Sequence, residues 1–364
     1  MAKNKNLNAA SRAKKDEFYT QIRDIENEMW HYRHHFKDKV VLCNCDDPYE
    51  SDFFKYFMIY FNQLGLRKVI ATCYAGSPIV QTELDFFGTQ NYNPHFDKRT
   101  QAIKLEVTEV TDLNGDGAAD LADVKLLLEN NRNVVTYLEG NGDFRSPECV
   151  EALKEADIVV TNPPFSLFRE YVAQLIAYDK KFLIIGNINC ITYKEIFPLI
   201  KENKVWLGYG MGRAISGFIV PETYELYGTE ARIDERGKRI VSTNQCLWLT
   251  NLDIVKRHKD ILLFKRYSQE PELFPHYDNY DAIEVPKTAF IPCDYFGVMG
   301  VPITFLDKYN PTQFEILGHT SSNDLSSAVE ALRTDPKNRN RGIINGKQKY
   351  DRILIRRRRN DAKE

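Results

Sequence analysis

Several features that mark other classes of protein are missing from this 364-residue sequence. It contains no apolar run of membrane-spanning length, and Met1–Leu7 is polar where a signal peptide would be apolar. There are no internal repeats. Charged residues make up 27% and hydrophobic residues 43% of the chain, which is ordinary for a soluble globular protein. We therefore expect a cytoplasmic protein without a membrane partner, built from a large domain with a smaller one or from two modest domains.

Cysteine shows no spacing that would support a disulfide framework or a zinc site. The seven cysteines are scattered, and most lie in apolar runs such as Val40–Cys43 and Gln245–Leu249. Cys43 and Cys45 have no second pair at zinc-ligand spacing, and neither does the pair His34–His35. We expect buried, reduced thiols and no zinc site.

Net charge is also small, since its formal value is -2. The basic residues are nevertheless unevenly distributed. Lys and Arg outnumber Asp and Glu from Arg333 to Glu364, a segment that contains the run Arg356–Arg359, and a smaller basic group lies between Lys3 and Lys15. Such clusters attract a phosphate backbone, although a solubilising basic tail has the same composition.

Short apolar runs alternate with helical patterns up to about residue 262. Continuous apolar strands that alternate with helices are typical of a parallel sheet covered on both faces. The pattern predicts a doubly wound, mostly parallel, seven-stranded α/β sheet, with strands at residues 39–44, 68–74, 134–138, 157–161, 181–185, 204–208 and 245–250. Crossover helices are expected at residues 52–61, 150–155 and 167–176.

Beyond about residue 262 the alternation fades, and the sequence becomes aromatic, proline-containing and irregular. This change predicts two domains, a larger one at residues 1–262 and a smaller region at residues 263–364.

The strand expected at residues 157–161 breaks into Asn162-Pro163-Pro164-Phe165, which we call the Asn162–Phe165 corner. The carboxyl end of a strand is where α/β proteins bind ligands. Asn162 offers a side-chain oxygen and Pro163 a main-chain oxygen, while the prolines fix the chain direction without adding a competing donor. The corner is thus suited to hold a planar amino group. Taken alone, it is equally consistent with a turn that ends a strand.

An exocyclic amine such as adenine N6 needs this help because its lone pair is delocalised into the ring. Two acceptors that hold both N–H protons favour the pyramidal, reactive geometry. Phe165 is then placed to stack on the ring, a contact that contributes on the order of 1 to 3 kcal/mol per base.

Acidic and aromatic residues also gather at other expected strand ends, which converge on one crevice in an open parallel sheet. They lie in Cys45–Pro48 and in Asn141–Phe144, and a further group, Asp16–Thr20, stands near the amino terminus. Carboxylates pair with hydroxyls and amines, and aromatic faces attract a sulfonium or ammonium charge. The pattern indicates a cationic, adenosine-containing cofactor.

These motifs together resemble those of adenine-N6 DNA methyltransferases and, over nearly the whole chain, those of the EcoRI-type modification methylase family. The resemblance is carried by Asp16–Gln21, Cys43–Pro48, Asn141–Phe144, Asp157–Ser166 and Gly300–Phe305. It implies a Rossmann-like catalytic domain that uses S-adenosylmethionine to methylate a flipped-out adenine in double-stranded DNA. Residues 263–364 would form the target-recognition region. The resemblance further implies a restriction-modification system with a cognate endonuclease for the same site.

The resemblance also implies roles for individual residues. The methionine end of the cofactor would lie near Phe18, Tyr19 and Thr20, its amino or ribose groups near Asp46 and Asp47, and its adenine near Asp143 and Phe144. Asn162, Pro163, Pro164 and Phe165 would bind the target adenine. Asn44, Pro48, Tyr74 and Asn162 complete the expected cofactor-binding set.

Two features common among methyltransferases of this fold are lacking. Asn44–Pro48 contains no glycine-rich loop after the first strand, and the second strand ends in Thr72–Tyr74 without the acid that usually binds ribose. Contacts between the main chain and the cofactor must therefore differ from the common pattern.

Asp112–Asp123 has oxygen side chains and a glycine at the spacing of a calcium-binding loop. Its last position is Asp where a bidentate Glu is usual, the preceding residues 104–110 have the pattern of a strand, and no second loop accompanies it. A turn followed by an Asp-capped helix explains the same residues, and we favour this reading without a metal.

Three other functions are compatible with the corner: adenine-N6 methylation of RNA, glutamine-N5 methylation of protein, and nucleic-acid binding without catalysis. For DNA specificity, Asn338–Arg341 offers side chains that read guanine and adenine edges, with phosphate contact or a solvated loop as the alternative. A monomer is compatible with the sequence.

Overall fold

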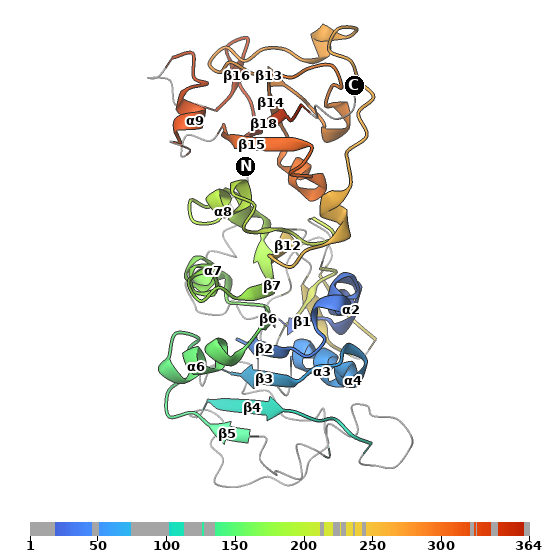
Figure 1. The fold of residues 1–364 in the computed structure, drawn as a ribbon, viewed down its shortest axis with the longest axis vertical. Helices are drawn as coiled ribbons and strands as arrows, with labels where there is room; N and C mark the ends of the chain where they lie inside the picture. Colours follow the sequence, from blue (N-terminus) through green and yellow to red (C-terminus); the bar gives the residue numbers. More distant parts are fainter. Residues whose placement is uncertain are drawn as a thin grey trace. The chain divides into compact units, whose positions relative to one another are not determined.

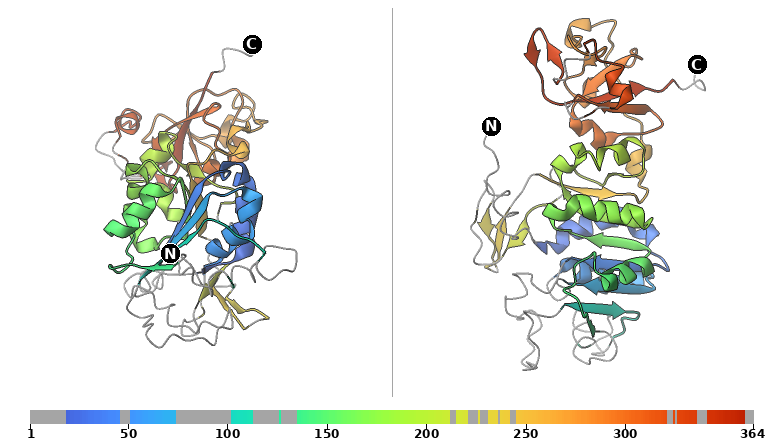
Figure 2. Two further views of the ribbon diagram at one scale, coloured as in Figure 1. Left: turned by 60° about the horizontal axis from the view of Figure 1, so that its bottom comes forward. Right: turned by 90° about the vertical axis from the view of Figure 1, so that its left-hand side faces the viewer.

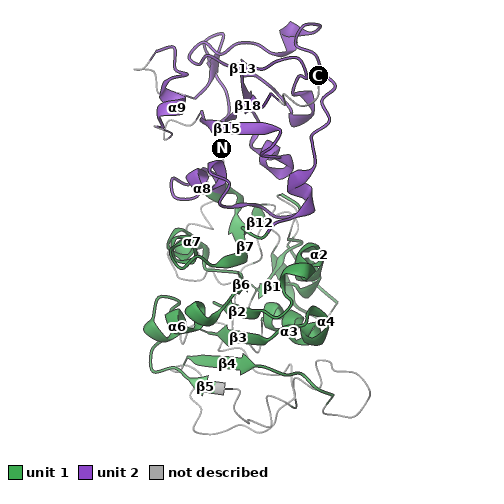
Figure 3. Ribbon diagram, viewed as in Figure 1, with its two compact units in different colours: residues 1–190, 210–252 green, residues 191–209, 253–364 purple. Residues whose placement is uncertain are grey.

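The computed structural model describes residues 19–45, 51–73, 102–112, 126, 135–211, 215–220, 226, 231–235, 237–241, 245–320, 324, 326–335 and 341–359. The chain divides into two compact units (Figure 3). Unit 1 comprises Met1–Cys190 and Gly210–Leu252, and unit 2 comprises Ile191–Tyr209 and Asp253–Glu364. The assignment of a catalytic role to residues 1–262 and of target recognition to residues 263–364 stays a prediction.

A large mixed sheet contains eight strands among the described residues, in the order β5-β4-β3-β2-β6-β7-β12-β8 (Figure 1). They are β2 (Val40–Asn44), β3 (Lys68–Thr72), β4 (Ile103–Val107), β5 (Val135–Tyr137), β6 (Ile158–Thr161), β7 (Lys181–Asn187), β8 (Trp206–Leu207) and β12 (Cys246–Thr250). The central strands β3, β2, β6 and β7 pair in parallel. By contrast, β4 is antiparallel to β3 and β5, and β12 is antiparallel to β7.

The expected α/β class is confirmed, but the sheet is mixed and has eight strands where the sequence predicted seven, mostly parallel. The additional strand, β4, is the segment expected ahead of the possible calcium loop. In β4, Ile103, Leu105 and Val107 are buried, while Lys104 and Glu106 are half-buried. This alternation is typical of an antiparallel strand, and it differs from the continuous apolar runs that identified the central strands.

Helices of unit 1 cover both faces of the large mixed sheet, as Figures 1 and 2 show. One face carries α2 (Ile22–Met29), α3 (Asp52–Ile59) and α4 (Phe61–Leu64), and the other α6 (Pro147–Glu155) and α7 (Phe168–Ala177). The strands between them are mostly apolar, and Val41, Leu42 and Val159 are fully buried. Burial of such a side chain contributes about 1.5 to 3 kcal/mol to stability.

A second, smaller sheet of unit 1 has the order β1-β9-β11-β10. Its strands are β1 (Tyr19–Thr20), β9 (Phe218–Val220), β10 (Arg232–Ile233) and β11 (Arg239–Val241). β1 is antiparallel to β9, with Thr20 opposite Phe218. The expected cofactor segment at the amino terminus is thus fixed by a segment distant in sequence.

Unit 2 contains a four-stranded sheet with the order β13-β14-β18-β15 and a two-stranded one, β16-β17. The strands of these two sheets are β13 (Ile283–Glu284), β14 (Val298–Val301), β15 (Phe314–His319), β16 (Ile343–Ile344), β17 (Lys347–Gln348) and β18 (Ile353–Arg357). The described α-helices of unit 2 are α8 (Phe197–Lys201) and α9 (Ser327–Glu330). The described 3-10 helices of the chain are Trp30–His35, Phe165–Leu167, Ile188–Thr192, Val255–His258, Pro271–Leu273, Thr288–Phe290 and Ile303–Lys308.

No helix among the described residues is long and apolar enough to span a membrane. None of the seven cysteines, all of which the structure describes, forms a disulfide, and five of them are buried, as expected for reduced thiols. The described residues contain no group of three or more His, Cys, Asp or Glu side chains that could hold a metal ion. Of the possible calcium loop, only Asp112 falls within the described residues.

Candidate active site

The Asn162–Phe165 corner lies at the carboxyl end of β6, next to the end of β2. The two strands are parallel neighbours, with Leu42 opposite Val159. Thr161 Oγ1 donates a hydrogen bond to the main-chain oxygen of Asn44, which ties the two strand ends together. Thr161 is fully buried and Asn162 is 7% exposed. The corner therefore begins from a rigid, buried position in the sheet.

Beyond the prolines the chain enters a helix at once. Pro164 precedes the 3-10 helix Phe165–Leu167, and Leu167 N donates to Pro164 O at 3.0 Å. α7 begins at the next residue, Phe168. Pro163 is buried whereas Phe165 is only half-buried, so part of the Phe165 ring remains accessible.

The Phe165 ring packs against β9, the strand that also holds the amino-terminal segment. Its centroid lies 6.4 Å from that of Phe218, in an edge-to-face arrangement. Thr20 faces Phe218 in the β1–β9 register, and Gln21 Nε2 donates to Gly217 O at 2.7 Å. Phe218 thus links the expected methionine-binding residues to the corner.

Thr20 is one of the buried polar groups of this region. Its side chain is 2% exposed, and its Oγ1 has no hydrogen-bond partner among the described residues. Burial of a hydroxyl without a partner costs about 1 to 3 kcal/mol. A polar ligand group at this position would remove that cost, so Thr20 fits the role of a cofactor contact.

Asn44, the last residue of β2, is held by a tyrosine of α7. Tyr171 OH donates a hydrogen bond to Asn44 Oδ1 inside the core. Burial raises the pKa of the Tyr171 hydroxyl well above its usual range, so this group stays a proton donor. The next residue, Cys45, has φ 92°, in the left-handed region that favours glycine. Cys45 thus takes a glycine-like conformation where the glycine-rich loop is lacking.

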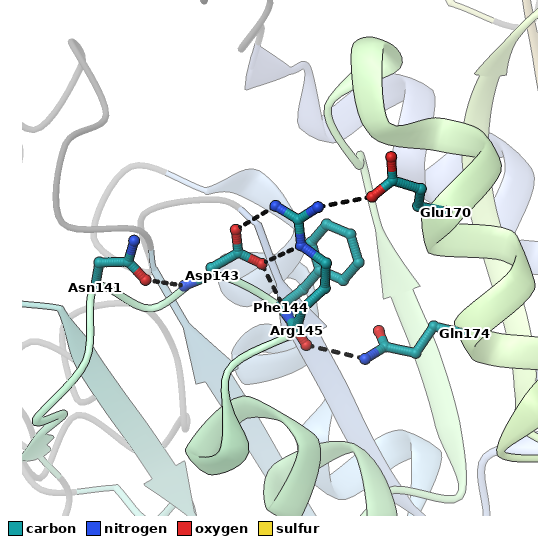
Figure 4. Close-up of polar contacts among 6 residues, drawn as sticks. All are labelled: Asn141, Asp143, Phe144, Arg145, Glu170 and Gln174. Atoms are coloured by element: carbon teal, nitrogen blue, oxygen red, sulfur yellow. Dashed lines mark hydrogen bonds and ion pairs between the residues drawn. The ribbon is translucent and has the colours of Figure 1, made fainter.

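The loop Asn141–Arg145 follows β5 and contains the expected adenine-binding residues. Gly142 has φ 75°, and a Cβ atom there would lie 2.0 Å from Cys73 O. No other residue type fits this position without moving the main chain. Asp143 N donates to Asn141 Oδ1 at 3.1 Å, which tightens the turn (Figure 4).

The carboxylate of Asp143 is paired with Arg145. Arg145 Nε donates to Asp143 Oδ1 at 2.9 Å and Nη2 to Oδ2 at 2.7 Å. These hydrogen bonds lower the pKa of Asp143, so its carboxyl group stays ionised. Arg145 Nη1 also donates to Glu170 on α7 at 2.6 Å (Figure 4).

Phe144 is buried and held from three sides. Its ring lies edge-to-face with Tyr171 at 5.0 Å, and the Arg145 guanidinium lies over it at 5.1 Å. Gln174 Nε2 donates to Phe144 O at 3.1 Å (Figure 4). Glu170, Tyr171 and Gln174 all lie on α7, which directly follows the corner. One helix therefore supports both the corner and the loop.

Among the sequence-predicted residues, Thr20, Asn44, Phe144 and the corner are thus linked through shared neighbours. Tyr19 pairs with Ile219 in the same small sheet. Phe18, Asp46, Asp47, Pro48 and Tyr74 lie outside the described residues, and their roles stay predictions. Four further residues that support the site were not predicted from the sequence: Arg145, Tyr171, Gln174 and Phe218. Only Arg145, next to the expected motif, carried a local signal.

The chain was also compared with known proteins. A family model described as adenine-specific methyltransferase EcoRI matches residues 6–358. The chain is 53% identical to Type II methyltransferase M.EcoRI of Escherichia coli, covering 98% of both chains. It is 36% identical to Type II methyltransferase M.MgeORF184P of Mycoplasma genitalium, over 96% of this chain and 98% of that protein. It is 33% identical to Type II methyltransferase M.MpnI of Mycoplasma pneumoniae, over 97% of this chain and 98% of that protein. No solved structure gives a significant match.

An α/β sheet with the Asn162–Phe165 corner at a strand end is consistent with a methyltransferase. The matches show that the chain belongs to the EcoRI family of adenine-specific methyltransferases, as its motifs predicted. It is an adenine-specific DNA methyltransferase.

Proposed function

We propose that the enzyme transfers a methyl group from S-adenosylmethionine to N6 of a flipped-out adenine at a specific site in double-stranded DNA. The observation that carries this proposal is the Asn162–Phe165 corner, which is fixed to the neighbouring strand end by the bond from Thr161 to Asn44. Family membership supports adenine as the target base.

In the proposed reaction, the Asn162 side-chain oxygen and the Pro163 carbonyl accept hydrogen bonds from the two N6 protons. N6 attacks the methyl group in line, and the cationic amine loses its proton afterwards, so that no strong general base is needed. Flipping the adenine out of the duplex costs a few kcal/mol. Stacking on the accessible part of Phe165 offsets about 1 to 3 kcal/mol of this cost.

The cofactor would supply a methyl group activated by its sulfonium charge. Thr20 offers the buried hydroxyl described above, and Phe18 and Tyr19 would flank the same end of the cofactor. Asn44, Asp46, Asp47, Pro48 and Tyr74 would line the ends of β2 and β3. Asp143 remains ionised and accepts hydrogen bonds, so it fits contact with the adenine of the cofactor, beside Phe144.

The Type II names of the relatives support a role in restriction-modification. Methylation would protect DNA from a cognate endonuclease that acts on the same site, in the cytoplasm. Sequencing DNA from a host that expresses the enzyme would reveal methyladenine and its sequence context together. Methyl transfer from labelled cofactor to duplex DNA, to RNA and to protein would separate the proposal from the RNA and glutamine alternatives.

The Asn162→Ala variant tests the corner directly. We expect single-turnover methylation to fall by roughly 100- to 1,000-fold, the usual effect of removing one group that stabilises a transition state. DNA binding should persist, because the Asn162 side chain is uncharged and does not attract a phosphate backbone. Asn162→Asp, which keeps an acceptor oxygen at nearly the same volume, should retain more activity than Asn162→Ala. Undiminished methylation by the Ala variant would disprove the assignment.

A further inference from the structure

The run Arg356–Arg359, which we call the arginine run, begins within a central strand of unit 2. β18 lies between β14 and β15, with Val298 and Glu315 opposite Arg356. The first residues of the strand, Ile353–Ile355, are buried. The run is therefore anchored in a sheet, unlike a loose solubilising tail.

Among the described residues, no carboxylate forms an ion pair with the arginine run. Four other cations of unit 2 are paired with carboxylates at 2.6 to 2.9 Å: Lys256 with Asp307, Lys265 with Glu270, Arg341 with Asp351, and Arg352 with Glu284. Within the part of the chain that the structure describes, none of the four arginines of the run forms such an ion pair, although Glu315 is the register partner of Arg356. The contrast marks the run as a local excess of positive charge.

Neutral groups hold these arginines in place instead. Arg357 Nη1 donates to Cys293 O, and Arg358 Nε donates to Pro311 O at 2.9 Å. Main-chain oxygens carry no net charge, so these bonds orient the guanidinium groups and leave their charge available. Such preorganisation reduces the entropy lost when a ligand binds.

An aromatic ring arranges two of the four side chains. The guanidinium groups of Arg357 and Arg359 lie 5.0 and 5.5 Å from the Phe296 ring centroid. Phe296 is 40% exposed. Residues two apart in an extended chain point to the same side, which explains why both reach this ring. Stacking on a ring face leaves the N–H edges of a guanidinium group directed outward.

We propose that the arginine run binds the sugar-phosphate backbone of the DNA substrate without regard to base sequence. Guanidinium groups bind phosphate oxygens in a bidentate manner, and a phosphate backbone supplies the negative charge that the run lacks. The identity of the polyanion rests on the proposed function, whereas the charge imbalance does not. Base reading would fall to other residues.

The experiment uses the full chain and a random-sequence DNA duplex with a fluorescent label. Binding is measured by fluorescence anisotropy across a series of KCl concentrations for the unmodified enzyme and for the triple variant R356Q/R358Q/R359Q. We expect the affinity of the triple variant to be lower by on the order of 10- to 100-fold at low salt. The slope of log affinity against log salt should become shallower by roughly 1 for each phosphate contact removed.

A pair of single variants provides a matched control. Arg359→Gln removes one unbalanced charge beyond the end of β18 and should lower both affinity and slope. Lys204→Gln removes one charge that is already paired with Glu202 at 2.8 Å, and it should change neither. Thermal unfolding will show whether each variant is folded, and Arg359 lies after the strand, where substitution spares the sheet.

Equal affinity and slope for the unmodified enzyme and Arg359→Gln would overturn the inference. Methylation at saturating DNA separates this failure from failure of the proposed function. If the unmodified enzyme methylates adenine while the arginine variants bind DNA normally, only the role of the run is wrong. If no adenine is methylated, the proposed function is wrong. Supporting results would be weaker, less salt-sensitive binding with unchanged maximal turnover.

Discussion

The candidate active site of unit 1 and the arginine run of unit 2 differ in whether their charged side chains form ion pairs. At the corner, the acceptors are an amide and a main-chain carbonyl, and the nearby Asp143 is balanced by Arg145. In the run, the described arginines are held by main-chain oxygens and a ring, with no ion pair to a described carboxylate. We therefore expect binding at the corner to depend mainly on the geometry of its acceptors, and binding at the arginine run to depend mainly on its positive charge.

This difference predicts two separate kinds of variant. Changes around the corner and the loop Asn141–Arg145 should alter turnover or cofactor affinity and leave the salt dependence of DNA binding unchanged. Changes in the arginine run should alter the salt dependence of DNA binding and leave turnover and cofactor affinity unchanged. The reason is that screening by salt acts mainly on exposed, unbalanced charges. The comparison would be wrong if a variant of the corner changed the salt dependence of DNA binding, or if a variant of the arginine run changed turnover.

The largest effect is expected for Gly142→Ala. The new Cβ would meet Cys73 O and the Ala102 side chain, at a φ of 75°. We expect a loss of about 2 to 4 kcal/mol in the free energy of unfolding, because left-handed strain and a main-chain clash add together. Cofactor affinity should fall as well. Urea unfolding and equilibrium dialysis with S-adenosylmethionine measure the two effects.

Gly237→Ala is the matched control, since Gly237 has φ 77° but no atom of another described residue lies within 4 Å of the added Cβ. It should lose only the strain contribution, about 1 to 2 kcal/mol. Equal losses for the two variants would show that the contact with Cys73 is unimportant.

The central part of this architecture was predictable because its signals are local. β2, β3, β6 and β7 are continuous apolar runs, and the position of the corner follows from the end of one of them. The pairing of β1 with β9 was not predictable. Two-residue strands show no periodicity, and Tyr19 meets Ile219 only through tertiary folding.

The supporting residues of the site were hidden for a related reason. In the sequence, Tyr171 is one aromatic residue on an apolar helix face, and only the folded chain brings it to Asn44. The segment Ile191–Tyr209, expected in the larger domain, likewise belongs to unit 2 because of contacts distant in sequence. Local patterns predicted the corner, whose role stays a prediction, but not the residues that contact it.

Tyr171→Phe should have an intermediate effect. It removes the hydroxyl donor to Asn44 Oδ1 and leaves that buried acceptor without this bond. We expect a loss of about 1 to 3 kcal/mol in the free energy of unfolding. Cofactor affinity should weaken because Asn44 loses its orientation. Isothermal titration with S-adenosylmethionine measures the affinity.

Tyr178→Phe, at the exposed end of the same helix, serves as the control and should change neither quantity. The salt dependence of DNA binding should be unaltered in both variants. If Tyr171→Phe bound the cofactor as tightly as the unmodified enzyme, Tyr171 would have no positioning role beyond packing.

The smallest effect is expected for Arg145→Gln, which removes the cation that balances Asp143. The side chains of this cluster are partly exposed, so the ion pairs themselves contribute only about 0.2 to 1 kcal/mol to stability. The pH dependence is more informative. Arg145 holds the pKa of Asp143 below its usual range, so the ionised carboxylate persists as the pH falls and is lost only at the lowered pKa.

In the variant, the pKa of Asp143 should return toward its usual range, and cofactor binding should be lost at a higher pH on acidification. Equilibrium dialysis between about pH 3 and about pH 7, a range of about 4 units that includes the ordinary carboxyl pKa, measures this shift. Glu170→Gln keeps the bonds between Arg145 and Asp143, so the pH at which this variant loses cofactor binding should shift less. If the unmodified enzyme and both variants lost cofactor binding at the same pH, the Asp143 carboxylate would not contact the cofactor. The balanced charges of unit 1 would then serve only to fix the loop.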